Sequence, residues 1–142
     1  MRYRRLTYRY EILVTPSVGW PPASQWQADA LRSVIGRAHW RPATDVYESP
    51  EALTVVVELP GVDAEELEAL LYEDALVVEG ERKLPCCEDD AVYRSAEIRQ
   101  GGFRVELPLD VAIDADGVES RYDRGLLYIR LPKQRLPKQQ AR

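Results

Sequence analysis

The chain has 142 residues, of which 45% are hydrophobic and 30% charged, and its formal net charge is −5. This length accommodates one domain with extensions, and no apolar run is long enough to span a bilayer, so we expect a cytoplasmic protein without a membrane span. The single histidine, His39, and the adjacent Cys86 and Cys87 provide neither a metal cage nor a catalytic triad. We therefore expect no enzyme activity, no cofactor and no metal site.

Charge is distributed unevenly along the chain. Residues 1–41 carry seven arginines against two acidic residues, residues 42–132 carry eight basic against 22 acidic residues, and residues 133–142 carry four basic residues. An acidic body between basic arms predicts that the arms of one subunit contact the bodies of its neighbours. The acidic body would repel phosphate, which argues against nucleic acid as a partner.

Residues 1–40 are predicted to form an arm that is extended at first and partly helical later. Apolar residues alternate between positions 6 and 14, which favours an extended segment, and the prolines between positions 16 and 22 keep the next stretch irregular. Across residues 24–36, apolar side chains recur at helical spacing between a capping serine and a glycine. Three tryptophans make this arm too apolar for a passive linker: Trp20, Trp26 and Trp40.

Residues 41–133 change to short alternating runs separated by turn residues. The predicted strands are 45–48, 52–59, 67–72, 75–79, 103–109, 118–122 and 126–131. Gly80 is expected to close the fourth of these, and Gly125 to allow the tight turn before the last, because glycine adopts positive φ without strain. Residues 81–95 form a long polar loop. This pattern predicts an all-β, immunoglobulin-like β-sandwich, followed by a short C-terminal tail over residues 134–142.

Five motifs in this region follow one another in a familiar order. They are Trp40–Glu48, Val57–Val62, Leu76–Lys83, the spaced set of Tyr93, Arg94, Glu97, Gly102 and Phe103, and finally Gly125–Leu127 with Leu131–Lys133. Their order resembles the α-crystallin domain of small heat-shock proteins of the bacterial and archaeal type, over about residues 40–133. The resemblance covers two-thirds of the chain.

The resemblance implies a chaperone of the stress response that needs no ATP. Such a holdase binds unfolding client proteins and prevents their aggregation until ATP-dependent chaperones refold them. The resemblance also implies a homo-oligomer built from dimers, in which a loop strand, Val92, Tyr93 and Arg94, pairs with the sheet of the partner. The alternative is a co-chaperone-type sandwich that acts as a protein-interaction module, but such domains lack the long exchanged loop.

Two features depart from the family pattern and leave the oligomer size open. The tail has only Leu136 where the family has an Ile-x-Ile/Val pair, and Val105 replaces an arginine expected two residues after Phe103. Ile12 and Val14 have the spacing of the missing pair, so the N-terminal arm could dock in a groove on a neighbouring sheet. An ordinary buried strand or a disordered end would explain the same spacing. The predicted groove residues are Leu67, Ala69, Leu71 and Val118.

The arm also supplies candidate contacts for clients, because unfolding proteins expose varied apolar surface. These candidates are Tyr8, Tyr10, Trp20, Trp26, Leu31, Val34 and Ile35. The alternative role is packing between subunits, and the two roles are compatible. Cys86 and Cys87 are interpreted as ordinary loop thiols rather than a redox switch, because a bond between adjacent cysteines is strained.

Overall fold

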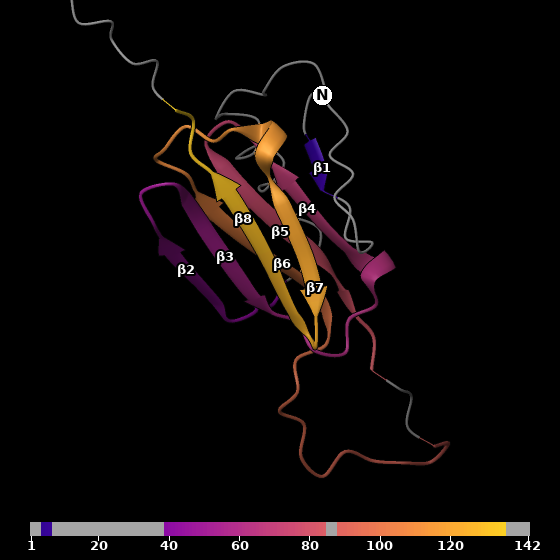
Figure 1. Cartoon of the computed structure of the whole chain (residues 1–142). Coiled ribbons are helices and arrows are strands. Elements are labelled where there is room, and N and C mark those ends of the chain that lie inside the picture. Colours follow the sequence, from indigo (N-terminus) through magenta and orange to yellow (C-terminus); the bar gives the residue numbers. More distant parts are fainter. Residues whose placement is uncertain (1–3, 7–38, 85–87, 136–142) are drawn as a thin grey trace, which may run out of the picture.

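The computed structural model describes residues 4–6, 39–84 and 88–135, which form a two-layer β-sandwich (Figure 1). One antiparallel sheet has the order β1–β4–β5–β6 and the other the order β2–β3–β8–β7. The strands are β1 Arg4–Leu6, β2 Thr44–Glu48, β3 Ala52–Glu58, β4 Leu67–Leu71, β5 Ala75–Arg82, β6 Gly101–Pro108, β7 Glu119–Asp123 and β8 Leu126–Pro132. Two 3₁₀ turns accompany them, η1 Ala64–Glu66 and η2 Ala115–Gly117. The predicted all-β sandwich is confirmed.

The core fills the space between the two sheets, and the alternation of the sequence explains which side chains enter it. In β3, Val55 and Val57 are fully buried, and they lie opposite Ile129 and Leu127 of β8. Phe103 of β6 is fully buried from the other sheet. Since successive side chains of a strand point to opposite faces, one alternating run per strand is enough to build this layer.

Gly80 does not close its strand as predicted, because β5 continues to Arg82. The residue pairs with Phe103 of β6, and a Cβ atom at this position would lie 2.0 Å from the carbonyl oxygen of Glu66 and 2.7 Å from Cζ of Phe103. The glycine is therefore needed for a close approach of backbone and ring inside the sheet rather than for a turn.

The turn between β7 and β8 has the predicted positive φ at Gly125, +82°, and a second positive φ of +51° at Arg124. Two positive φ values at the centre of a two-residue hairpin are the signature of a type I′ turn, which matches the twist of the flanking strands. Gly125 also packs closely on Pro60, because an added Cβ would lie 2.9 Å from the Cα atom of that proline. The turn is therefore fixed both locally and by its neighbour.

Of the N-terminal arm, the structure describes β1 and the last two residues, His39 and Trp40. Apart from Leu6, the stretch predicted to be extended lies outside the described residues. The predicted helix over residues 24–36 lies outside the described residues. Within the described part of the chain, no helix is long and apolar enough to cross a membrane.

Candidate assembly interface

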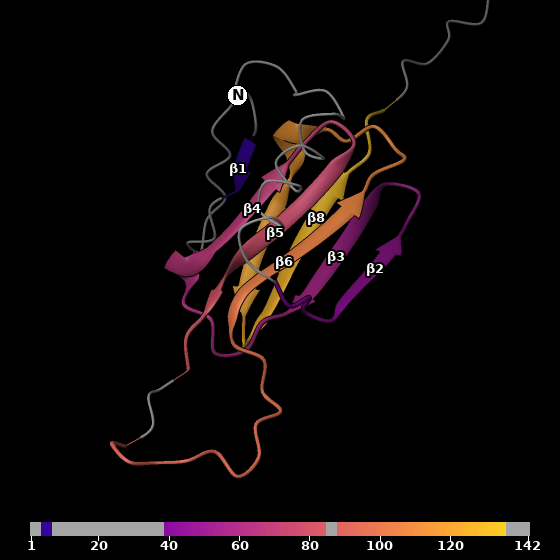
Figure 2. The same ribbon diagram turned by 180° about the vertical axis from the view of Figure 1, so that it is seen from behind.

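A long loop between β5 and β6 projects from one end of the sandwich (Figures 1 and 2). It carries the predicted exchange residues Val92, Tyr93 and Arg94, all of which are exposed, with Val92 84% and Tyr93 60% accessible. Ile98 farther along is 69% accessible. Residues 88–100 form no strand within this single chain. The loop therefore presents three exposed apolar side chains on a segment that belongs to neither sheet of its own chain.

The base of this loop is fixed by Arg82 at the end of β5. Its Nε donates a hydrogen bond to the carbonyl oxygen of Arg99 at 2.7 Å, and Nη1 donates to the carbonyl oxygen of Pro60 at 3.3 Å. The guanidinium lies 4.3 Å from the ring centroid of Trp40, which makes a cation–π contact. Since Arg82 and Arg99 flank the loop, the loop leaves the domain from a rigid support.

Trp40, at the start of the domain, also packs at the base of the loop. Its indole Nε1 donates to the carbonyl oxygen of Gly101 at 3.2 Å, and its ring meets Phe103 edge-on at a centroid distance of 5.5 Å. The sequence indicated that Trp40 is part of no passive linker, but it did not indicate the role of Arg82. The hydrogen-bond partners of Arg82 are backbone carbonyls 17 and 22 residues away in the sequence, and no local pattern around a single arginine predicts such contacts.

β2 forms an open edge of its sheet, because within the described residues it pairs only with β3. Two of its side chains are large, apolar and exposed, Val46 at 51% and Tyr47 at 58%. In the described part of the chain, the exposed large hydrophobic side chains are these two and three on the loop, Val92, Tyr93 and Ile98. An open edge with apolar side chains is a template for pairing with another strand.

Arg104, which the sequence places beside the missing family arginine, faces away from the core. Its side chain is only 7% exposed, its Nε donates to Oε1 of Glu106 at 2.6 Å, and its guanidinium also pairs with Glu79. Val105 is fully buried in the core. Arg104 is therefore engaged within its own sheet.

The four predicted groove residues belong to the core. Leu67, Ala69, Leu71 and Val118 are no more than 4% exposed and pack in the main cluster between the sheets. The N-terminal arm does reach the open edge of β4, but the described contact is β1, with Arg4 opposite Leu71 and Leu6 opposite Ala69. Ile12 and Val14 lie outside the described residues, as do the client candidates Tyr8, Tyr10, Trp20, Trp26, Leu31, Val34 and Ile35, so docking of Ile12 and Val14 in a groove stays a prediction.

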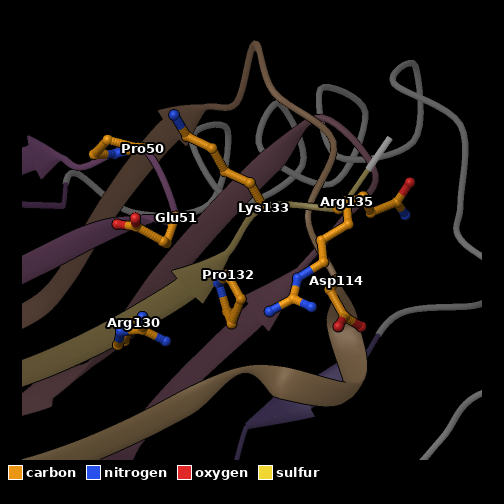
Figure 3. A pocket seen from close by; sticks show the side chains of 8 residues that line it. Pro50, Glu51, Asp114, Arg130, Pro132, Lys133 and Arg135 are labelled. Atoms are coloured by element: carbon orange, nitrogen blue, oxygen red, sulfur yellow. The ribbon is translucent and has the colours of Figure 1, made fainter. Parts of the chain in front are cut away.

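A shallow depression lies where the chain leaves the last strand (Figure 3). It is lined by residues of both charges, and Arg135 extends to the side on which Asp114 lies, while Lys133 pairs with Glu48. Gln134 is held by two hydrogen bonds, from its backbone N to Ala112 at 2.8 Å and from its Nε2 to Ile113 at 3.1 Å. The depression therefore anchors the start of the tail.

The described residues contain no group of three side chains placed to hold a metal ion. His39 packs against Gly102, where an added Cβ would lie 2.9 Å from its ring. Tyr122 has a structural role, because its hydroxyl donates to the carbonyl oxygens of Leu59 at 2.6 Å and Val62 at 3.3 Å. Burial raises the pKa of Tyr122 above its ordinary value.

Comparison with known proteins identifies the same domain. The model of the Hsp20/alpha crystallin family matches residues 45–142. Heat shock protein 16 of Schizosaccharomyces pombe is 35% identical over 96 residues, which cover 65% of this chain and 66% of that protein. Small heat shock protein C2 of Rickettsia felis is 27% identical over 92 residues, which cover 65% of this chain and 60% of that protein. The chain thus spans less than two thirds of either curated relative.

Solved structures agree with this comparison. A small heat-shock protein from Xylella fastidiosa, which forms a distinct high order structure, superposes with a TM-score of 0.65 at 29% identity, covering 73% of this chain and 95% of that one. Heat shock protein 16.0 from Schizosaccharomyces pombe superposes with a TM-score of 0.62 at 31% identity, covering 72% and 98%.

Proposed function

The chain belongs to the Hsp20/α-crystallin family, and we propose that it is an ATP-independent holdase chaperone. It binds proteins that unfold under stress and keeps them soluble until ATP-dependent chaperones refold them. The family and the sandwich support this function. Client contacts are assigned to the aromatic N-terminal arm, since varied apolar side chains can bind many unfolded partners without a fixed shape.

The dimer forms by exchange of the loop strand Val92–Arg94. The observation that carries this proposal is the distribution of exposed apolar side chains, which occur only on the loop and on the open edge of β2 among the described residues. Addition of the loop strand of one subunit to β2 of the other would satisfy the open backbone groups and cover Val46 and Tyr47. A two-fold arrangement makes both exchanges at once.

Charge favours the same pairing. Arg94 is exposed on the loop, and β2 presents the exposed carboxylate of Asp45 along its edge. Opposite charges on neighbouring strands contribute to pairing and fix its register. The loop is also anchored at its base by Arg82, so less conformational freedom is lost when the strand docks.

A light-scattering assay tests the function. A heat-aggregating enzyme is warmed alone, with equimolar chain, and with the chain in excess, each with and without ATP. Suppression of scattering that rises with subunit ratio and does not change with ATP supports the holdase. Full aggregation of the enzyme at subunit excess would contradict it and leave the co-chaperone-type interaction module as the better description.

A further inference from the structure

A second apolar cluster lies on the outer face of the β1–β4–β5–β6 sheet. It consists of Leu70, Tyr72, Ala75 and Val77, which alternate with the core-facing residues of β4 and β5. The outer face of an antiparallel sheet is ordinarily polar, because it meets water. All four side chains are nevertheless no more than 8% exposed. We call this set the outer patch.

Burial on this side of the sheet requires a cover other than the second sheet, which occupies the opposite face. The burial extends across the width of the sheet, from Leu70 on β4 through Val77 on β5 to the guanidinium of Arg104 on β6. Nη2 of Arg104 is also buried and has no hydrogen-bond partner among the described residues. A cover over the patch must therefore be about three strands wide.

The path of the chain identifies this cover. Leu6 on β1 lies opposite Ala69 of β4, at one edge of the sheet. Trp40 lies beside β6 at the opposite edge, where its backbone N donates to Gly102 and its carbonyl oxygen accepts from Arg104, both at 3.1 Å. Residues 7–38 connect these two edges of one sheet. Figure 2 shows that the other sheet closes the inner side, so the direct route crosses the outer face.

The segment is long enough and of suitable composition. Four strand spacings of about 4.8 Å separate β1 from Trp40, or roughly 19 Å, which 32 residues span with ease. The segment contains Trp20 and Trp26 and several aliphatic residues, and its basic residues outnumber its acidic ones by three to two. Glu79 and Glu106 lie on the outer face beside the patch.

We propose that residues 7–38 cross the outer face of this sheet and dock the apolar side chains around Trp20 and Trp26 on the outer patch of the same chain. The patch is thus an interaction surface for the chain's own N-terminal arm, on the face opposite the core residues Leu67, Ala69 and Leu71. This docking does not depend on chaperone activity, and its test is therefore structural.

Site-directed photocrosslinking in the full chain identifies the occupant. Glu68→Cys places a thiol on the outer face at a half-buried position, in a chain whose native thiols are removed by Cys86→Ser and Cys87→Ser. After attachment of benzophenone maleimide and illumination, we expect crosslinked peptides from residues 7–38. The control, Tyr47→Cys on the other sheet, should give a different set of peptides without this segment.

Mixing isotopically light and heavy chains distinguishes the chain's own arm from that of a second copy. Crosslinks confined to one isotope support the proposal. Crosslinks between isotopes, crosslinks to the tail, or none to residues 7–38 would overturn it.

Thiol protection gives a second measurement with a matched control. Val77→Cys and Val78→Cys are adjacent and fully buried, but on opposite faces of β5. When the arm carries Trp20→Ser and Trp26→Ser, labelling at position 77 should become at least ~10-fold faster while labelling at position 78 stays unchanged. Equal changes at both positions, or no change at 77, would refute docking on the patch.

Discussion

Replacing the two apolar residues of the loop strand, Val92→Ser with Tyr93→Ser, should separate the dimer without unfolding the domain. Val92 is 84% and Tyr93 60% exposed in the single chain, so neither contributes to the core. Full burial of such a side chain contributes about 1.5–3 kcal/mol. Only the part that is exposed in the single chain can be buried on association, so each of the two residues should contribute about 1.5 kcal/mol to dimer formation. A two-fold dimer buries both loops, which gives about 6 kcal/mol in total.

Part of this energy offsets the ordering of the two loops on association. If half is lost in this way, about 3 kcal/mol remains, and the dissociation constant should rise by about 100-fold. Sedimentation or native mass spectrometry over a dilution series measures this constant. The control, Glu88→Ser with Asp89→Ser, changes exposed polar residues of the same loop and should leave it unchanged. An increase of less than about threefold, with an unchanged urea midpoint, would refute strand exchange through these residues.

Three further outcomes are expected. Gly80→Ala should lower the free energy of unfolding by about 3 kcal/mol in urea titrations, because the new Cβ meets the fixed carbonyl of Glu66; a loss below about 1 kcal/mol would contradict the close approach. Tyr122→Phe removes the hydroxyl hydrogen bonds and should lower the free energy of unfolding by about 1 kcal/mol at pH 7. Because the pKa of Tyr122 is raised in the folded state, the stabilisation by the neutral hydroxyl is present below pH ~10 and is lost as the pH rises through the folded pKa. The unfolding free energies of the two proteins should therefore converge at alkaline pH. Ile12→Glu with Val14→Glu should lower the native oligomer mass, because this pair is predicted to dock in a groove on a neighbouring subunit; an unchanged mass would contradict the groove docking and would leave the docking of the tryptophans on the outer patch untouched.

Most of the sandwich could be predicted because its signals are local. Seven predicted strands correspond to β2–β8, and the positive φ at Gly125 follows from the need for a tight turn. Gly80 was misinterpreted, since a glycine in a strand looks the same in sequence whether it ends the strand or admits a neighbour's backbone. Arg82 was missed for a related reason, because its carbonyl partners, Arg99 and Pro60, belong to segments that are distant from it in the sequence.

Local sequence patterns were sufficient to locate strands β2–β8, most of their turns and the one long loop that interrupts them. Periodicity and turn chemistry act over a few residues, so they can be read without knowledge of the fold. The tertiary structure was needed to show that β2 is an edge strand with exposed apolar side chains, and that the outer face at Leu70 and Val77 is apolar yet buried. The first depends on the order of strands in the sheets, and the second on what packs against the outer face. These are long-range properties that no local pattern encodes.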